Sequence, residues 1–351
     1  MDAVFSFSGL SAKISAMQGK LLTDEDYRAI SELKNLSEFA SYLSRLPGYP
    51  DHLIEKDFSK IHREDLEEIF QNVILYDFHK IYHFCDSKKK IFMDMIFMNY
   101  EANYLKRVIR YLLDHRPDRH YSEKNPLFWT YSNLDQEAIE KANHMEDLLV
   151  ALKNTRYYHS LYVTSQMANP RPFDYTMALD LSYYSSIWKM KKRFFSGKEE
   201  AIISELYGRL IDLSNISWIY RAKKYYSMKT PHIYPLLIPI NYRLNVEDIK
   251  ALAQVEDMSH YHEALQATQY KRFFTNQKRN LSFDDAKDAI LKEIYQTRRR
   301  EHPYSYAIIY TYLYLKEQEI LNLITGCECI RYGYPPYEVY RKMTRTGGDK
   351  A

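Results

Sequence analysis

The chain has 351 residues, of which 46% are hydrophobic and 27% charged, so it can bury a core and is not expected to be disordered. Its formal net charge of +3 is too small to indicate a nucleic-acid-binding protein. It contains 34 Tyr but only 9 Gly, which argues against folds that need many tight turns or Gly-rich phosphate loops.

Neither a signal peptide nor a membrane-spanning segment is predicted. Residues 1–22 lack a basic head followed by a solid apolar core. No apolar run approaches the roughly 20 residues of a spanning helix. The three Cys residues are too few for a disulfide framework and are expected to be reduced. We therefore expect a cytoplasmic protein, which could still bind a membrane complex through another protein.

Helical periodicity dominates the chain. Apolar residues recur every three or four positions over residues 64–84, and again over residues 91–113, 202–213 and 312–330. No series of alternating apolar and polar residues predicts a set of strands. The sequence therefore predicts an all-α protein.

The segment 91–113 carries a heptad-like seam, in which apolar residues lie alternately four and three positions apart: Ile91, Met95, Met98, Ala102, Leu105, Ile109 and Leu112. The seam lasts only three heptads, which is short for a free coiled coil. We therefore expect it to pack against another helix of the same chain.

Candidate helix N-caps recur at Thr23, Asn143 and Asn245, each followed by acidic residues. Apolar residues follow the first and last caps at the same distances of 7, 16 and 20 residues: Ile30, Phe39 and Leu43, and then Leu252, Tyr261 and Leu265. After the middle cap come Val150, Tyr157 and Leu161, the last two of which fall two positions early.

A second landmark is an Asn on a predicted long helix, followed by basic and aromatic residues. It occurs at Asn103, Asn215 and Asn322, which lie 80, 72 and 77 residues after the three caps. The two landmarks together predict three helical repeats, over residues 1–118, 119–230 and 231–343, with a flexible tail at 344–351. The alternative is chance, because any all-helical chain offers such matches.

The common catalytic motifs are absent. The sequence has no P-loop, no G-x-G-x-x-G and no G-x-S-x-G. His79 and His83 lie one helical turn apart, as zinc ligands can, but Lys80 stands where H-E-x-x-H has its general base. A solvated or hydrogen-bonded helix face is the simpler interpretation. We predict no catalytic residue, no cofactor and no metal.

Residues 218–226 form the densest mixture of aromatic and basic side chains. Such a mixture can stack nucleic-acid bases. It equally suits a protein interface, in which Tyr, Trp and Arg are enriched. Because the net charge is low, we favour a protein partner.

The chain resembles the C subunits of prokaryotic A/V-type ATPases, which are the counterparts of the d subunit of eukaryotic V-ATPases. The similarity begins with Ala12-Lys-Ile-Ser-Ala-Met17 and continues through Lys20-Leu-Leu22, Tyr27, Leu33 and Tyr42-Leu43. It is clearest in Asn215-Ile-Ser-Trp-Ile-Tyr-Arg-Ala-Lys-Lys-Tyr-Tyr226, in Glu317-Gln-Glu-Ile-Leu-Asn322 and in Ile330-Arg-Tyr-Gly-Tyr-Pro-Pro336. It departs from the family at Ser15, where a basic residue is common, and in its excess of Tyr.

This resemblance implies an all-α funnel of three pseudo-threefold-related helical repeats. It also implies a non-catalytic rotor protein that receives the central shaft, made of subunits D and F, and rests on the membrane rotor ring, which is built from the c/K subunit. Such a rotor protein transmits torque and couples ATP hydrolysis or synthesis to H⁺ or Na⁺ transport. The ion site would lie in another protein of the complex, so this sequence does not identify the ion. The alternative function is a helical-repeat scaffold that binds nucleic acid or protein.

A torque-bearing spacer needs surfaces that dock its partners, and the basic residues that follow Asn103, Asn215 and Asn322 are the candidates. We predict that the interface includes Arg107, Arg110, Arg221, Lys223, Lys224 and Arg331. The competing interpretation is that these side chains form ion pairs within the chain.

Overall fold

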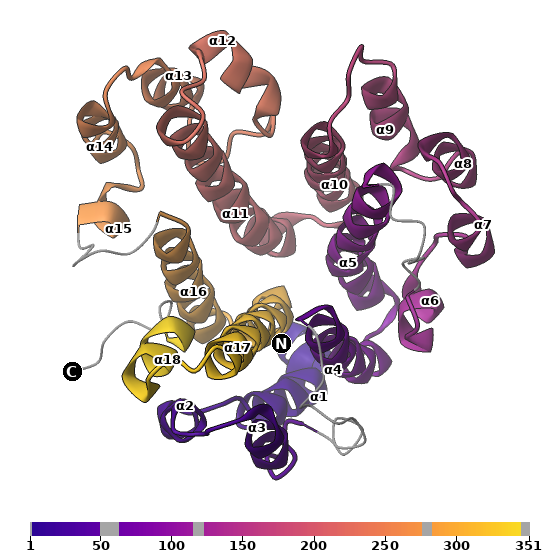
Figure 1. The fold of residues 1–351 in the computed structure, drawn as a ribbon, viewed down its shortest axis with the longest axis vertical. Helices are drawn as coiled ribbons and strands as arrows, with labels where there is room; N and C mark the ends of the chain where they lie inside the picture. The colour runs from indigo at the N-terminus through magenta and orange to yellow at the C-terminus, as the bar shows by residue number, and fades with distance from the viewer. Residues whose placement is uncertain (1, 50–62, 115–122, 276–282, 345–351) are drawn as a thin grey trace. The chain divides into compact units, whose positions relative to one another are not determined.

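The computed structural model describes residues 2–49, 63–114, 123–275 and 283–344, and within these ranges the structure is helical, without strands (Figure 1). The all-α prediction is therefore confirmed. The chain divides into two compact units. The first comprises residues 1–85 and 277–351, and the second comprises residues 86–276.

The first unit is built around one long helix, α17 (Tyr306–Arg331), which packs against helices from both ends of the chain. Its neighbours are α1 (Asp2–Gln18), α2 (Asp24–Ser31), α3 (Leu36–Leu43), α4 (Arg63–His83), α16 (Phe283–Glu301) and α18 (Pro336–Met343). In this unit the predicted helix over residues 64–84 is confirmed as α4.

The second unit contains three long helices, α5 (Ser87–Leu113), α10 (Pro172–Phe194) and α11 (Gly197–Lys224). Its short elements are α6 (Pro126–Tyr131), α7 (Gln136–Glu140), α8 (Met145–Ala151), α9 (Tyr158–Ser165), α12 (Thr230–Ile233), the 3₁₀ turn η3 (Tyr234–Leu236), α13 (Val246–Gln254), α14 (Met258–Gln266) and α15 (Lys271–Thr275). The helix α10 packs against both α5 and α11, and α13 and α14 pack against α11.

Long helices follow one another in three pairs along the chain: α4 with α5, α10 with α11, and α16 with α17. Short helices precede each pair, as the colour gradient of Figure 1 makes visible. The predicted repeat boundaries remain predictions. The boundary between residues 118 and 119 and the tail after Thr344 lie outside the described residues.

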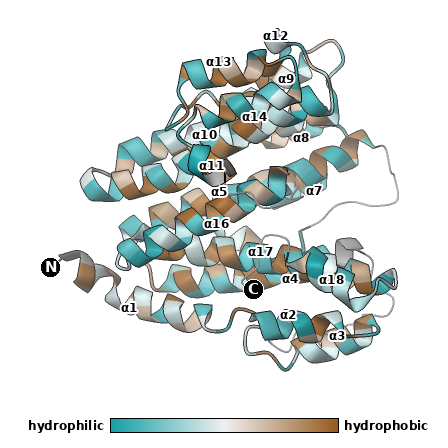
Figure 2. Ribbon diagram, turned by 90° about the vertical axis from the view of Figure 1, so that its left-hand side faces the viewer, coloured by the Kyte–Doolittle hydropathy of each residue, from teal (hydrophilic) through white to brown (hydrophobic). Residues whose placement is uncertain are grey.

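The seam predicted on residues 91–113 is a buried face of α5. Met95, Met98, Ala102, Leu105 and Ile109 are each at most 2% exposed. They lie on the helix that packs most extensively on α10, within the second unit, so the expectation of an intrachain helix pair is confirmed. Hydrophobic colour runs along α4 and α17 in Figure 2, whereas α2 and α18 are largely hydrophilic.

Two of the three predicted N-caps are confirmed. Thr23 and Asn245 cap α2 and α13, and each closes a reciprocal capping box with the Asp three residues later. The middle cap is wrong by one residue. Helix α8 begins after His144, because the carboxylate of Asp147 accepts hydrogen bonds from the backbone N–H groups of both Asn143 and His144.

The apolar positions counted from the caps are buried after the first and last caps, where all six are at most 1% exposed. After the middle cap the count fails at Val150, which is 74% exposed. Tyr157 and Leu161 are buried as predicted. The buried residues of α8 are Met145, Leu148 and Leu149, and its C-cap residue Leu152 is also buried, so this helix is in a different register from the one the cap count assumed.

One of the few glycines, Gly208, has a clear structural role inside α11. A Cβ atom on Gly208 would come within 2.3 Å of Cγ of Tyr242. The missing side chain therefore lets the segment before α13 pack directly on α11. At the same place the backbone N–H of Tyr242 donates to Oδ1 of Asp212, at 3.2 Å.

Candidate docking surfaces and the buried carboxylates of the long helices

The six predicted interface residues lie in the last turns of three long helices. Arg107 and Arg110 lie near the end of α5, and Arg331 is the last residue of α17. The remaining three, Arg221, Lys223 and Lys224, lie in the last turn of α11. Basic residues at helix C-termini also stabilise the helix dipole, so position alone does not separate docking from local stabilisation.

The end of α11 presents the most open of these surfaces. Arg221 and Lys224 are exposed, and Tyr225 and Tyr226, which follow them, are 63% and 70% exposed. Nζ of Lys224 donates to the hydroxyl of Tyr220 at 2.7 Å, and this hydrogen bond raises the pKa of Lys224. The ammonium group therefore stays charged, and it lies over the rings of the buried Tyr220 and the exposed Tyr225. We call Arg221, Lys224, Tyr225 and Tyr226 the α11 surface.

The sequence around the α11 surface contains no acidic residue. From Leu213 to Val246 there is neither Asp nor Glu, but there are five basic residues: Arg221, Lys223, Lys224, Lys229 and Arg243. The segment as a whole thus carries a strong local positive charge in a chain of net charge +3. A surface of this kind favours an acidic partner surface.

A turn with a left-handed residue ends α11 next to the α11 surface. Ser227 has a φ of 46°, a left-handed conformation that costs a non-glycine residue about 1–2 kcal/mol. The amide of Met228 then donates to the carbonyl of Ala222, at 3.0 Å. Lys223 points toward this turn, with Nζ 3.4 Å from Oγ1 of Thr230. Lys223 is therefore held within the turn.

The end of α17 carries a second exposed group of tyrosines. Gly333 ends the helix with a φ of 68°, and the chain then passes through two prolines into α18. Tyr332 and Tyr337 are 71% and 67% exposed, and Tyr334 is also exposed. Arg331 is only partly exposed, and its Nη1 lies 3.0 Å from Oε1 of Glu328. At the end of α17, the exposed area therefore comes more from the tyrosine rings than from Arg331.

The end of α5 differs from the other two. Arg107 is partly buried and its Nη2 lies 3.6 Å from Oε2 of Glu123, itself 3% exposed. Arg110 is exposed. For Arg107 and Arg331, the structure therefore has the intrachain ion pairs that the competing interpretation expected.

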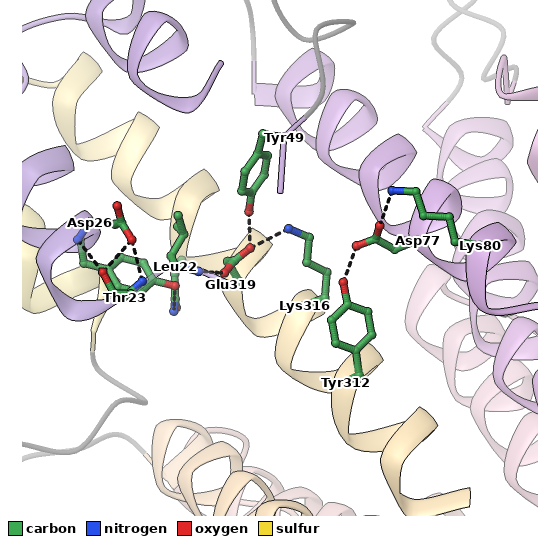
Figure 3. Close-up of polar contacts among 11 residues, drawn as sticks. Leu22, Thr23, Asp26, Tyr49, Asp77, Lys80, Tyr312, Lys316 and Glu319 are labelled. Carbon is green, nitrogen blue, oxygen red and sulfur yellow. Dashed lines mark hydrogen bonds and ion pairs between the residues drawn. The ribbon is translucent and has the colours of Figure 1, made fainter. Parts of the chain in front are cut away.

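Buried carboxylates occur near the middle of the same three helices. On α17, Glu319 accepts hydrogen bonds from the backbone of Leu22 and from the hydroxyl of Tyr49 (Figure 3). Lys316 contributes a third contact, with Nζ 2.7 Å from Oε1 of Glu319 and 3.9 Å from the centre of the Tyr49 ring. This group joins α17 to the loop before α2 and to the chain after α3.

On α5, Glu101 makes the corresponding contacts. Its carboxylate accepts from the hydroxyl of Tyr157 at 2.8 Å, from Oγ of Ser132 at 2.8 Å and from the backbone of Asn133 at 2.8 Å. Arg156 supplies a nearby positive charge and contacts the sulfur of Met98, one turn before Glu101. The group joins α5 to the loop before α7 and to the chain after α8.

On α11, Asp212 repeats the pattern once more. It accepts from the hydroxyl of Tyr270 at 2.8 Å and from the backbone of Tyr242, Arg243 and Leu244 at 3.2, 2.7 and 3.0 Å. The guanidinium of Arg209 lies 5.4 Å from the centre of the Tyr270 ring. Burial raises the pKa of Asp212 even though these hydrogen bonds oppose it.

The three groups share one chemistry. In each, a buried acid accepts at least one backbone N–H group from the loop that precedes a short capped helix. It also accepts a Tyr hydroxyl from the chain that follows the next short helix. Burial raises the pKa of Tyr49, Tyr157 and Tyr270 far above the ordinary value, so each phenol stays protonated and donates. These contacts fix the short helices on the long ones.

No metal centre with three protein ligands is found among the described residues. His79 and His83 face each other at the end of α4, with their Nε2 atoms 3.0 Å apart. Cys327 and Cys329 are buried in α17, and burial raises the pKa of Cys327. Of the helices in the described ranges, none combines the length and the apolar character needed to span a bilayer.

Comparison with known proteins identifies the family. The family model of the ATP synthase (C/AC39) subunit matches residues 10–342. The chain belongs to this family. The match includes all six predicted interface residues, the three buried carboxylates and their three tyrosines.

Members of the family that this chain is similar to include three archaeal proteins, each named as the C subunit of an A-type ATP synthase. The Methanosphaera stadtmanae protein is 23% identical over 325 residues, which are 89% of this chain and 81% of the relative. The Pyrococcus furiosus protein is 25% identical over 333 residues, 90% of this chain and 84% of the relative. The Desulfurococcus protein is 24% identical over 341 residues, 95% of this chain and 89% of the relative.

Two features of the structure were not predicted from the sequence. The first is the exposed group Tyr332, Tyr334 and Tyr337, which the motif Tyr-Gly-Tyr-Pro-Pro followed by Tyr could have indicated. The second is the set of buried carboxylates. Each lies two or three residues before one of the Asn landmarks, but nothing in the local sequence distinguishes a buried acid from an exposed one.

Proposed function

We propose that this chain is a non-catalytic rotor subunit of an A/V-type ATPase, which links the central shaft of subunits D and F to the membrane rotor ring and transmits torque between them. The coupling would serve H⁺ or Na⁺ transport. The chain would lie on the cytoplasmic side, peripheral to the membrane. The match over residues 10–342 to an ATP synthase subunit family carries this proposal.

The three buried carboxylates support a pseudo-threefold arrangement. Glu101 on α5 holds the short helices that follow in the chain, and Asp212 on α11 does the same. Glu319, on the last long helix, holds the first short helices. The order of contacts is therefore cyclic, as expected if three similar modules, with boundaries near residues 118, 230 and 343, surround a central axis to form a funnel.

The physical properties of the helices suit a spacer that bears torque. Long helices with packed, buried seams resist bending, because protein interiors are as dense as organic crystals. Only 9 of 351 residues are Gly, so few positions add backbone freedom. The buried Tyr–carboxylate groups fix the short helices to the long ones at three places.

Docking to the partners is assigned to the exposed ends of the long helices. The α11 surface combines an Arg with two exposed Tyr rings, and both residue types are enriched at protein interfaces. Arg110, and the tyrosines after α17, extend the candidate surfaces. Arg107, Lys223 and Arg331 contribute less directly, since each is also held by contacts within the chain.

The first test is capture of partners from native membranes. An affinity-tagged copy of the full chain should be isolated with its ATPase complex, and mass spectrometry should identify subunits D and F and the protein of the rotor ring. A low-salt or chelating wash without detergent should release the chain from the membrane. Absence of every ATPase subunit from the captured material would refute the proposal.

The second test addresses the α11 surface. The variant Arg221→Glu/Lys224→Glu should lose binding to the shaft or to the ring, while keeping its helical circular dichroism spectrum. The matched control is Lys153→Glu/Lys250→Glu, which changes the net charge equally at two exposed positions of the same unit. If both variants bind the complex as the unmodified chain does, docking does not involve the α11 surface.

A further inference from the structure

Two imidazoles meet at the C-terminal end of α4, in the first unit. His79 and His83 lie one helical turn apart, and their Nε2 atoms are 3.0 Å from each other. Their rings are 4.3 Å apart between centroids and nearly perpendicular, at 87°. His79 is half-buried and His83 is exposed. The two Nε2 atoms are within hydrogen-bond distance of each other, so an ion that binds both nitrogen atoms must displace this hydrogen bond.

We propose that His79 and His83 form a bidentate site for a divalent transition-metal ion, with Cu²⁺ and Ni²⁺ preferred over Zn²⁺. With metal–nitrogen bonds of about 2.05 Å, a separation of 3.0 Å corresponds to an N–metal–N angle of about 94°. This is close to the roughly 90° between neighbouring positions of a square-planar or octahedral ion. A tetrahedral Zn²⁺ ion needs a wider angle of about 109°.

The dipole of α4 favours a cation at this place. The site lies at the negative end of the α4 dipole, since α4 ends at His83.

Two positive groups lie near the site. Nζ of Lys80 lies 3.3 Å from Oδ1 of Asp77 and 4.0 Å from the centre of the Tyr76 ring. Nζ of Lys13 lies over the ring of Phe84, 5.5 Å from its centre. The charge of Lys80 is thus paired with a carboxylate, whereas Lys13 keeps its positive charge beside the residue that follows His83.

The site is one for binding and not for hydrolysis. Lys80 occupies the position at which the zinc peptidase motif has its general base. Among the described residues, no third protein ligand completes the site. An ion bound to both imidazoles joins two successive turns of α4 and favours the folded helix end. This inference does not depend on the proposed rotor function.

The test uses the full chain without a polyhistidine tag. Titration with Cu²⁺, followed by calorimetry and electron paramagnetic resonance, should show one equivalent bound through two imidazole nitrogens. The variant His83→Ala should weaken this binding about tenfold or more, because one imidazole does not chelate. His79→Ala should have the same effect. A spectrum without two-nitrogen coordination in the unmodified chain would overturn the proposal.

A matched control separates this site from the other histidines, of which the chain has 12 in all. His260 lies on α14, two residues from His262, a spacing that does not place both imidazoles on one face. The variant His260→Ala should keep the binding of the unmodified chain. Equal loss in His260→Ala and His83→Ala, or no loss in either, would contradict a chelate at the end of α4.

Discussion

The hydroxyl of Tyr157 donates a 2.8 Å hydrogen bond to Oε2 of Glu101, which lies 56 residues earlier in the chain. Both residues are buried, at 1% and 2% exposure. The contact joins the chain after α8 to the middle of α5. The pairs Tyr49–Glu319 and Tyr270–Asp212 make the same kind of contact at two other places in the chain.

Removing the Tyr157 hydroxyl should destabilise the chain. The variant Tyr157→Phe should lower the free energy of unfolding by about 1.5–3 kcal/mol, the range for a hydrogen bond to a charged group. The carboxylate of Glu101 keeps its bonds from Ser132 and Asn133, which limits the loss. Urea denaturation followed by circular dichroism measures the change. The neighbouring variant Tyr158→Phe is the control and should change the free energy by less than about 0.5 kcal/mol.

Removing the positive charge from the Glu319 group should have a larger effect. Lys316 is 1% exposed, and Glu319 is 4% exposed. Lys316→Met leaves a buried carboxylate without its ion pair and should cost about 3–5 kcal/mol. The double variant Lys316→Met/Glu319→Gln removes both charges and should be more stable than the single variant. The prediction fails if denaturant unfolding finds the double variant equally unstable.

The capping box of α2 predicts a dependence on pH. Burial alone would raise the pKa of Asp26, but hydrogen bonds from the Thr23 side chain and backbone and from Tyr42 outweigh it and lower the pKa. The folded chain therefore binds this proton more weakly than the unfolded chain. The charge on Asp26 contributes stability at neutral pH, and this stability is lost as the pH falls below the ordinary value of 3.8.

Asp26→Asn should accordingly cost about 1 kcal/mol at pH 7, and the difference from the unmodified chain should shrink as the pH approaches 3. Unfolding free energies at both pH values measure this gap. Glu25→Gln, an exposed change of equal charge in the same turn, should show no such trend. A gap that widens toward pH 3 would mean that the pKa of Asp26 is raised on folding.

Exposed aromatic rings at the end of α11 should matter for binding and not for folding. Tyr225→Ala/Tyr226→Ala should change the free energy of unfolding by less than about 0.5 kcal/mol, because both rings are largely exposed. The same variant should bind its partner complex at least about tenfold more weakly, as truncation of aromatic interface residues often does. Tyr162→Ala, on the exposed face of α9, is the control. Equal affinities for both variants would exclude the α11 surface from the interface.

The local sequence correctly predicted those features that depend on a single helix, such as its buried face and its N-cap. The spacing of Met95, Met98 and Leu105 predicts one buried face of α5, because an α-helix places every third or fourth residue on the same side. Thr23 and Asn245 are caps because each needs only the backbone and one Asp within the next turn. Such features depend on residues within about four positions of each other.

The second group of short helices shows where local reasoning stops. The cap belongs at His144, and the short helix α7 begins earlier, after Asp135. The counts from Thr23 and Asn245 start at helices that follow a carboxylate-bound loop, but the count from Asn143 starts one helix later, at α8, and so it reaches the exposed Val150. Spacing between elements depends on how each loop packs, which the residue pattern of one helix does not determine.

By itself, the sequence determined the all-α class, the long helices with their buried seams, two of the caps and the family resemblance. These follow from periodicity and from motifs that are local in the chain. Only the tertiary structure decided which acids are buried, which tyrosines bind them and which basic side chains remain exposed. Glu101 and Tyr157 lie 56 residues apart, and Glu319 and Tyr49 lie 270 apart. Their contacts form only when several helices pack together, because burial is a property of the packed unit and not of the residue.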